Sequence, residues 1–567
     1  MKTVIRMHRL LLVVLSLVCG FALRAQDRPD FVHEFGAPGQ KGSFRIRFDD
    51  RGASVYTVQL LDHFASVDAA ARSEGERTPG DYMLLVGDGA SVYSLQVDEV
   101  GTSLFEGKLA GGTWTRRVEA GAVSFSIESS SGLRLTKTYR HRPEQRGLAL
   151  ELKLENTGSA IAAGQLLTLR IAAPALTNRT ELAMFGTSAW AIAVSEGGEP
   201  KHLGATTDGL MQELDAGGLP LSMAGSSNRF FGGFVFPLDA ASAAAAGRIE
   251  VESLPYSPNP ALEIAARSMP RAWIQARLAV PANGASTQLA YGVYLGPKSF
   301  TVFEESPELA RFQPILDVDL EPPCCGSVVV PGGRFMATML VKLLGFFHGM
   351  TGVWGLAIML LTILVRGCLA PLNFRMQKSM RAYGKKMGEL KPKLDAIKMK
   401  YADDPQAHQQ AMIAFQREHK LMPPIGGCLP IFLTMPIYIG LFTALRTSYD
   451  LRQQGFLFMA DLSAPDALFP LPFWPSLFNV LPLVWIALMV ILQSRMPLPT
   501  DPQQRQMQQI MRYMPLMFGV MLYNYASGLM VYMVTSMIWT FGESAVTKKI
   551  LGPIDPNAAS LAPQPMM

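Results

Sequence analysis

The chain falls into two parts by the way its hydrophobic and polar positions alternate. Between residues 27 and 330, apolar residues recur at every second position in short runs such as Phe44-Arg45-Ile46-Arg47-Phe48, and the same alternation occurs in 123–127, 133–139 and 148–154. Runs of this kind, separated by turn residues, are typical of strands in an antiparallel β-sandwich. We therefore predict an all-β domain over 27–330, with many strands or two stacked sheets.

Beyond residue 334 the apolar segments become long, and about 20 apolar residues are enough for a helix to cross a bilayer. The fold class that we predict for this part is a membrane α-helical bundle. Its five expected core spans are 351–372, 425–445, 473–493, 513–525 and 528–546. The fourth span is short for a full crossing, so we expect it to bend or to thin the membrane locally.

Two further segments are expected at the membrane. Residues 1–26 carry Lys2, Arg6 and Arg9 before an apolar run, which is typical of a secretory signal peptide or a short uncleaved anchor. On either interpretation the following domain is exported. Residues 334–348 place three polar residues at helical spacing along one face, which predicts an amphipathic helix in the membrane interface. The alternative is a helix packed on the preceding domain.

Loop charges predict which side of the membrane each segment occupies. Residues 373–422 hold eleven Lys or Arg against five Asp or Glu, and we expect them to form a cytoplasmic helical hairpin because basic loops stay inside. The tail, 551–567, is expected on the same side. The basic face of the hairpin is suited to ribosomal RNA, anionic lipid or a partner protein, but ordinary positive-inside charge predicts the same residues.

Arg366 interrupts the first span, and it is the most informative residue of the chain. A guanidinium within a membrane helix costs a few kcal/mol, so it usually faces protein or a water-filled cavity and indicates function. The competing interpretation is that its long side chain reaches the cytoplasmic headgroups.

Methionine is concentrated in the membrane part, where 24 of the 31 residues follow position 335. Flexible Met side chains suit a surface that contacts varied apolar partners, although core filling is their more common use. The candidate contact surface comprises Met435, Met514, Met517, Met521, Met530 and Met533.

The sequence carries no recognisable catalytic chemistry. Its five cysteines show no metal-ligand spacing, and the histidines of the exported part form no nucleophile–base arrangement. It contains no phosphate-binding glycine loop. We predict no enzyme activity, metal, cofactor or nucleotide.

Four motifs carry a resemblance to a known family. In chain order they are Val365-Arg366 with Pro371-Leu372, Leu390-Lys391-Pro392-Lys393, Gly426-Gly427-Cys428-Leu429-Pro430 with Met435-Pro436, and Ser527-Gly528-Leu529 with Val531-Tyr532. Over 334–550 the chain resembles YidC-type membrane protein insertases. The exported part is similar in placement to the periplasmic β-supersandwich of the Gram-negative members.

The resemblance implies an insertase and folding chaperone for nascent inner-membrane proteins, alone or beside the Sec translocon. It places the chain in the bacterial inner membrane, in contact with lipid, with its large domain in the periplasm. It also implies a hydrophilic groove in which Arg366 is the positive charge and four hydroxyl residues are candidate liners: Thr362, Thr434, Ser536 and Thr540. Hairpin lysines are candidate contacts for a ribosome: Lys385, Lys386, Lys391 and Lys393.

Two departures from the family pattern affect these expectations. Ala526 stands where the family often has proline, and the tail after Gly552 has no Lys or Arg.

Two other functions are alternatives to the insertase. A small-anion transporter would use Arg366 as its binding site but should show inverted repeats, which the five spans lack. An anchored sugar-binding or sugar-isomerising protein would need only one span.

Overall fold

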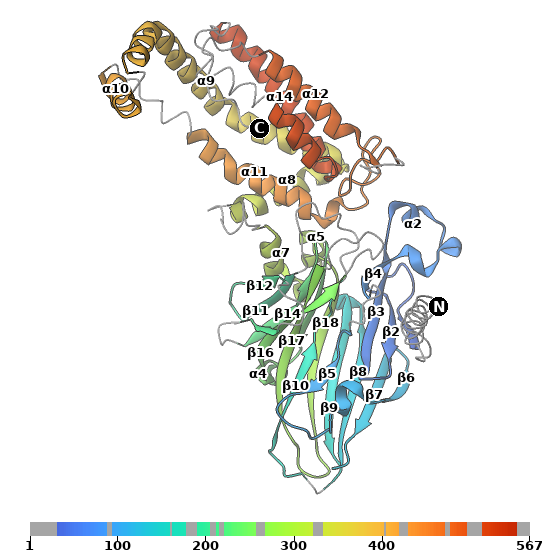
Figure 1. The fold of residues 1–567 in the computed structure, drawn as a ribbon. Coiled ribbons are helices and arrows are strands. Elements are labelled where there is room, and N and C mark those ends of the chain that lie inside the picture. Colours follow the sequence, from blue (N-terminus) through green and yellow to red (C-terminus); the bar gives the residue numbers. More distant parts are fainter. Residues whose placement is uncertain are drawn as a thin grey trace, which may run out of the picture. The chain divides into compact units, whose positions relative to one another are not determined.

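The computed structural model describes twelve stretches of the chain. The chain forms two compact units (Figure 1). One unit consists of Met1–Ala65, Arg72–Arg179 and Ser188–Gly296, and the other consists mainly of Pro297–Met567. The described residues are 31–87, 93–158, 161–176, 190–204, 211–214, 220–256, 267–320, 333–401, 404–418, 429–470, 477–495 and 513–552. The expected N-terminal segment, 1–26, lies outside them.

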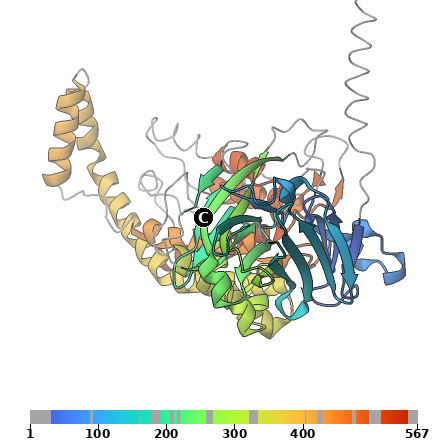
Figure 2. The same cartoon turned by 90° about the horizontal axis from the view of Figure 1, so that it is seen from below.

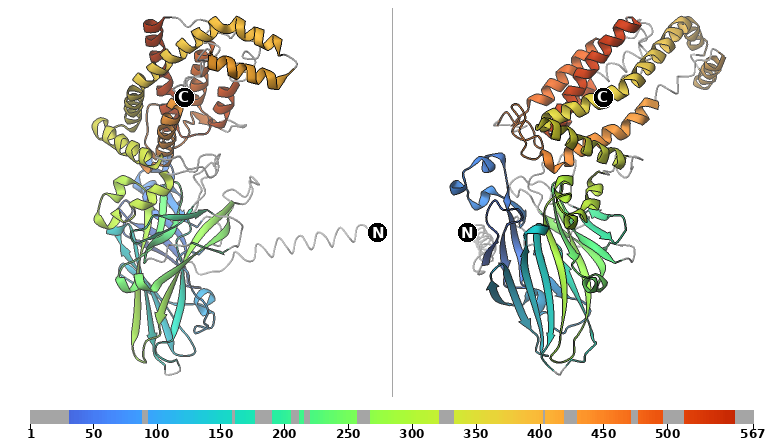
Figure 3. Two further views of the ribbon diagram at one scale, coloured as in Figure 1. Left: turned by 90° about the vertical axis from the view of Figure 1, so that its left-hand side faces the viewer. Right: turned by 180° about the vertical axis from the view of Figure 1, so that it is seen from behind.

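The first unit is built on a nine-stranded antiparallel sheet. In spatial order its strands are β12 (Lys201–Gly204), β11 (Trp190–Ser195), β14 (Leu221–Ser227), β15 (Phe231–Pro237), β18 (Ser286–Pro297), β9 (Gly147–Asn156), β8 (Leu133–Arg142), β7 (Ala122–Glu128) and β6 (Thr115–Glu119). The long strands β8, β9 and β18 run side by side (Figure 3). The β-strands predicted from period-two alternation are therefore present.

Two smaller sheets complete this unit. The five-stranded sheet has the order β13 (Met211–Glu213), β16 (Ala246–Tyr256), β17 (Arg267–Ala279), β10 (Leu166–Ala172) and β5 (Val97–Glu99). The four-stranded sheet has the order β1 (Phe31–Phe35), β2 (Phe44–Asp49), β3 (Ser54–Phe64) and β4 (Tyr82–Val86). Short helices also lie between strands of this unit: α3 (Lys108–Gly111) and α4 (Ala240–Ala245). The short helix α2 (Val67–Ala71), which falls between β3 and β4 in sequence, is assigned to the second unit.

Strand alternation decides which side chains form the core of the sandwich. In β2, Phe44, Ile46 and Phe48 are fully buried, and the two arginines between them are partly exposed. Burial of such side chains stabilises the fold by roughly 1.5–3 kcal/mol each. The large all-β sandwich region expected over 27–330 is confirmed for the described residues of this part.

One inward position of β8 departs from the apolar pattern. Lys137 is fully buried, and its Nζ donates hydrogen bonds to the carbonyl oxygens of Leu95 and, at 2.7 Å, Ala53. The hydroxyl of Tyr139 donates to the same Ala53 oxygen at 2.8 Å. Ala53 and Leu95 both have a positive φ, so these side chains stabilise two backbone positions that L-residues rarely adopt. Burial holds the pKa of Lys137 well below its usual value.

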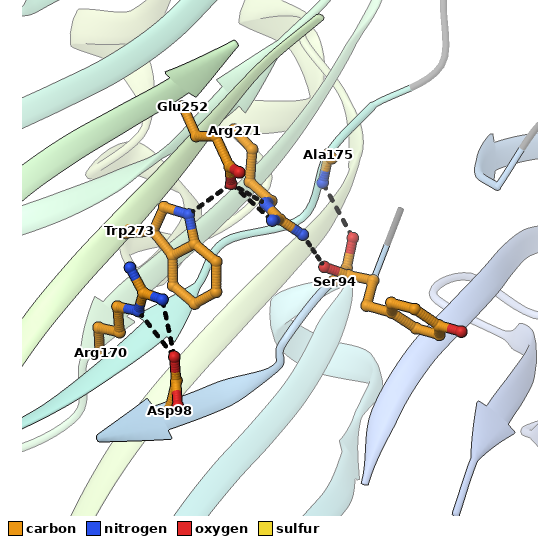
Figure 4. A network of polar contacts seen from close by, with 8 residues as sticks. Ser94, Asp98, Arg170, Ala175, Glu252, Arg271 and Trp273 are labelled. Atoms are coloured by element: carbon orange, nitrogen blue, oxygen red, sulfur yellow. Dashed lines mark hydrogen bonds and ion pairs between the residues drawn. The ribbon is translucent and has the colours of Figure 1, made fainter. Parts of the chain in front are cut away.

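A polar network joins the strands of the five-stranded sheet (Figure 4). Glu252 on β16 accepts hydrogen bonds from Arg271 Nη2 at 2.6 Å and from Trp273 Nε1 at 2.9 Å. The guanidiniums of Arg271 and Arg170 each lie 4.6 Å from the Trp273 ring centroid. Arg170 Nη2 also donates to Asp98 on β5 at 2.7 Å. The network therefore connects β16, β17, β10 and β5 through side chains as well as through the sheet.

The second unit is helical. Its elements are α5 (Phe300–Phe303), α6 (Pro307–Ala310), α7 (Gln313–Leu320), α8 (Gly333–Thr351), α9 (Trp354–Lys400), α10 (Pro405–Glu418), α11 (Leu429–Thr447), η6 (Tyr449–Leu451), β19 (Phe469–Pro470), β20 (Leu477–Phe478), α12 (Val480–Ser494), a helical segment at 513–521, and α14 (Ser527–Leu551). Its core combines residues of α8, α9, α11 and α14 with the segment that precedes α12.

Two helices of the described residues are long and apolar enough to cross a membrane. They are Trp354–Ser379, the first part of α9, and Ser527–Leu551, which is α14. The apolar helix Val480–Ser494 is shorter than this criterion requires. The expected span 425–445 begins outside the described residues, which resume at 429. The five-span count therefore stays a prediction.

The helix that carries Arg366 continues without a break into the expected hairpin. α9 includes Pro371 and Pro392 and ends at Lys400, so the predicted boundary between span and hairpin falls within one helix. The far part of α9 turns back through α10 (Figure 2), and Leu394 packs against Phe415 there. Proline is tolerated inside a long helix when neighbouring groups compensate for the lost hydrogen bond.

Helix α8 buries one face and exposes the other. Its buried residues, Ala337, Leu340 and Leu344, face the other helices of the unit. Phe335, at 71% exposed, and Phe346, at 62%, lie among its exposed positions. Exposed aromatic residues of this size are compatible with the interfacial position expected for 334–348, which remains a prediction.

Candidate functional site

The candidate site is centred on Arg366, whose side chain is enclosed by three helices. The residue lies on α9 and is 6% exposed. Its Nη2 donates a hydrogen bond to Ser536 Oγ on α14. Its Cζ lies 5.5 Å from the centroid of the Tyr438 ring on α11. Of the two interpretations of this arginine, the arrangement favours a side chain that faces protein.

The local sequence explains why Arg366 is on the packed face of α9. Ile358, Thr362 and Arg366 follow one another at intervals of four residues, so they lie along one face of the helix. Ile358 and Thr362 are each 1% exposed. The Thr362 hydroxyl donates to the Ile358 carbonyl oxygen at 2.7 Å. Thr362 is therefore next to Arg366 in the helix, but its hydroxyl proton is used within α9.

A line of polar side chains on α14 faces the arginine. Tyr532, Ser536 and Thr540 recur every four residues, and Glu543 lies on the same face one turn further. Tyr532 and Glu543 both interact electrostatically with Arg366. The Thr540 hydroxyl donates to the Ser536 carbonyl oxygen at 2.9 Å, and among the described residues the guanidinium donates to Ser536 and not to Thr540.

The positive charge of Arg366 is only partly compensated. Within the described residues it donates to one hydroxyl and lies over the Tyr438 ring, and it interacts electrostatically with Tyr532 and with the Glu543 carboxyl, which is not in ion-pair contact with it. Interactions between charges strengthen as the local dielectric falls, so a cation in this environment attracts a nearby carboxylate more strongly than it would in water. The site can therefore act as a local attractor for negative charge.

Two of the residues expected to line the groove lie together. Arg366 and Ser536 were predicted to belong together, and the structure brings them into contact. Tyr438, Tyr532 and Glu543 were not predicted as site residues. A signal for Glu543 was present, because a carboxyl group within an apolar helix indicates a functional position by default. Thr434 lies in α11, but its side chain is outside the described part of the chain.

The predicted methionine surface divides into exposed and buried members. Met514 is 42% exposed, Met517 is 63% exposed and Met435 is 38% exposed. Met530 is 1% exposed and belongs to the core of the helical unit, so its placement matches the core-filling alternative. Met521 and Met533 are half-buried. The exposed members alone are available for contact with an apolar partner.

The candidate hairpin lysines all lie on α9. Lys393 is exposed. For Lys385, Lys386 and Lys391 the structure describes the helix backbone but not the side chain. No group of His, Cys, Asp or Glu within the described ranges is arranged to hold a metal ion.

Known proteins similar to this chain match its helical half. The family described as 60Kd inner membrane protein matches residues 346–553. A "Membrane protein insertase YidC" of Neisseria meningitidis serogroup C is 36% identical over 267 residues, which cover 47% of this chain and 43% of that protein. The protein of the same name from Neisseria gonorrhoeae is 35% identical over 277 residues, covering 49% and 44%.

A third relative, from Pseudoalteromonas atlantica, carries the same name and is 34% identical over 46% of this chain and 43% of its own length. The chain thus matches less than half the length of these relatives. Among solved structures, a GalM/aldose epimerase homologue from C. elegans covers 47% of this chain and 98% of its own, at 10% identity and a TM-score of 0.29, which carries no functional argument. The match over 346–553 and the named relatives confirm that the helical half of this chain resembles YidC-type membrane protein insertases.

Proposed function

We propose that this protein is a membrane protein insertase and folding chaperone that transfers nascent inner-membrane proteins into the bilayer. The observation that carries the proposal is the position of Arg366, a cation enclosed by α9, α11 and α14. Among the described residues, its hydrogen-bond partner is the hydroxyl of Ser536. The similar proteins from Neisseria are named membrane protein insertases, which agrees with the proposed function.

The proposed mechanism follows from the cost of moving polar groups through hydrocarbon. A hydrated groove beside Arg366 shortens the distance that a polar segment must cross without water. The guanidinium attracts an acidic segment of the nascent chain, and Ser536 and Tyr438 hold the guanidinium in place. The apolar part of the substrate then passes along exposed Met514 and Met517 into lipid.

The other proposed features concern topology and partners. We place the domain 27–330 in the periplasm and the five spans in the membrane. The charges of the loops place the hairpin 373–422 and the tail 551–567 in the cytoplasm. The ribosome would bind the hairpin through its lysines, and the Sec translocon would act as an optional partner. No cofactor or nucleotide is needed, because membrane potential supplies about 2.3 kcal/mol per charge per 100 mV.

The test replaces Arg366 and follows insertion of a small substrate with an acidic exported tail. Arg366→Ala should reduce insertion of this substrate, whereas Arg366→Lys should retain part of it because the charge remains. Arg375→Ala is the matched control, since Arg375 lies on the same helix and is exposed. Equal insertion by all variants would remove the charge-attraction mechanism.

A further inference from the structure

The loop that joins α11 to α12 exposes an apolar turn. Phe456 and Met459 exchange two backbone hydrogen bonds, of 2.9 and 3.0 Å, so Leu457 and Phe458 form the tip of a tight two-residue turn. Leu457 is 82% exposed and Phe458 is 46% exposed. Residues 453–460 include no charged residue. A turn tip facing water usually carries polar residues or glycine, and this one does not.

The backbone of the tip is also unusual for its residues. Leu457 has a φ of 54°, in the left-handed region where Gly, Asn and Asp are preferred at such turns. A leucine at this position has an unfavourable backbone conformation, and its apolar side chain is exposed where water would surround it. An apolar medium around the tip would account for both features.

The loop is fixed to the beginning of each candidate membrane span. A Cβ on Gly355, the second residue of α9, would collide with the ring of Phe456, so the base of the turn packs directly on that helix. At the start of α14, Ser527 N donates to the Ala464 oxygen at 2.7 Å and Gly528 N donates to the Leu462 oxygen at 2.8 Å. The loop therefore lies level with the N-terminal ends of both spans.

A second exposed apolar pair lies at the other end of the same loop. Leu468 is 49% exposed and Phe469 is 46% exposed. The Phe469 ring stacks on Phe478 with 4.7 Å between the centroids. Asp466 accepts hydrogen bonds from the first backbone N–H groups of α12, Val480 at 2.6 Å and Leu481 at 2.9 Å, and this holds the pair beside a third apolar helix.

We propose that the loop 456–469 inserts its tip into the membrane, with Leu457 and Phe458 buried in the lipid leaflet at the N-terminal ends of α9 and α14. The partner is the bilayer itself, because the loop is tied to the ends of two spans and the tip lacks charge. Such a loop would fix the height of both spans, and hence of Arg366, relative to the membrane surface. The inference rests on the membrane position of α9 and α14 under the proposed function.

The experiment places a nitroxide at single cysteines in the full chain, with its five native cysteines replaced by serine, in phosphatidylethanolamine–phosphatidylglycerol vesicles. The test site is Leu457→Cys. Val118→Cys, on β6 and 48% exposed, is the aqueous control, and Ile538→Cys, on α14 and 59% exposed, is the lipid control. Collision with oxygen reports lipid, and collision with a water-soluble nickel chelate reports water.

The proposal predicts that position 457 resembles position 538, with at least a threefold higher oxygen-to-nickel collision ratio than position 118. If 538 is in lipid while 457 matches 118, the proposed loop insertion is wrong and the membrane bundle stands. Low collision with both agents at 457 would indicate protein contact and also overturn it. If 538 itself is accessible to nickel, the membrane position of α14 fails first, and the loop inference fails with it.

Discussion

Arg366 on α9 donates a hydrogen bond to Ser536 on α14, although 170 residues separate them in the chain. The contact connects two helices that, among the described residues, are long and apolar enough to cross a membrane. A buried polar group that loses its partner destabilises the structure more than the net value of the bond, because the remaining group stays desolvated. The pair therefore links the stability of the helical unit to the position of its central charge.

Removing the Ser536 hydroxyl should weaken the helical unit. Ser536→Ala leaves the guanidinium without its hydrogen-bond acceptor, and we expect a loss of about 1–3 kcal/mol in the free energy of unfolding. Unfolding in mixed micelles measures the change. Ser544→Ala is the control, because Ser544 is exposed on the same helix and its hydroxyl donates only to the Phe541 oxygen. Equal effects of the two variants would contradict a specific role for Ser536.

Glu543 should weaken the electrostatic attraction between Arg366 and an incoming carboxylate, because its own negative charge interacts with the guanidinium. Glu543→Gln removes its negative charge, and a change of about 0.5–1 kcal/mol in the attraction of an acidic segment corresponds to roughly a twofold to fivefold rise in its insertion. Parallel insertion assays with acidic-tailed and neutral-tailed substrates measure this. Glu418→Gln is the control, because Glu418 is exposed on α10. Unchanged or lower insertion of the acidic substrate would show that Glu543 does not compete.

Lys137 should give the β unit a stability that rises with pH. Burial lowers the pKa of Lys137, so the unfolded chain binds more protons than the folded chain between that lowered pKa and the usual value near 10.4. Stability therefore increases as pH rises through this window. Lys137→Met should abolish the slope, and hydrogen exchange of β8 at several pH values in the full chain measures it.

The control for this prediction is Lys153→Met. Lys153 lies opposite Thr136 on the neighbouring strand, and its side chain is 45% exposed. It should leave the slope unchanged. A slope that persists in Lys137→Met would mean that other groups cause it.

The stability that the polar network around Trp273 contributes should depend on Arg271. Burial alone would raise the pKa of Glu252, but Arg271 and the Trp273 hydrogen bond outweigh it and lower the pKa. The ionised Glu252 therefore stabilises the folded protein at pH values above the pKa that Glu252 has in the unfolded chain. This stabilisation is lost as the pH falls through the lower pKa that Glu252 has in the folded protein. Arg271→Ala should cost about 2–3 kcal/mol, less than for a fully buried pair because the Glu252 side chain is 25% exposed. Denaturant unfolding at neutral and acidic pH measures it, and a cost independent of pH would contradict the linkage.

Much of the fold follows from hydrophobic periodicity, and the exceptions have physical causes. The alternation in β2 and β8 predicts their buried faces because period two leaves few other ways to bury the apolar side chains. Lys137 was not predictable as a core residue, since its burial depends on the carbonyl groups of Ala53 and Leu95, which are distant in sequence. Hydropathy also gave no reason to expect that the first span and the hairpin form one helix through Pro371.

The candidate site could be predicted from the sequence only where one residue type marks it. A guanidinium in an apolar run marks Arg366 regardless of its neighbours. Its partners depend on how α9, α11 and α14 pack, so Tyr438 and Tyr532 could not be distinguished from other aromatic residues of those helices. Thr362 and Thr540 were chosen for their hydroxyls, which the structure shows bonded within their own helices.

The measurement that tests the central claim most directly is photo-crosslinking to ribosome-bound nascent membrane proteins. A photoreactive residue at position 540, one turn from Ser536, is compared with one at 538, which is exposed on the same helix. The account predicts crosslinks to the acidic segment of the substrate from 540 but not from 538, and their reduction in Arg366→Ala. Crosslinks of equal yield from both positions, or their full retention in Arg366→Ala, would contradict it.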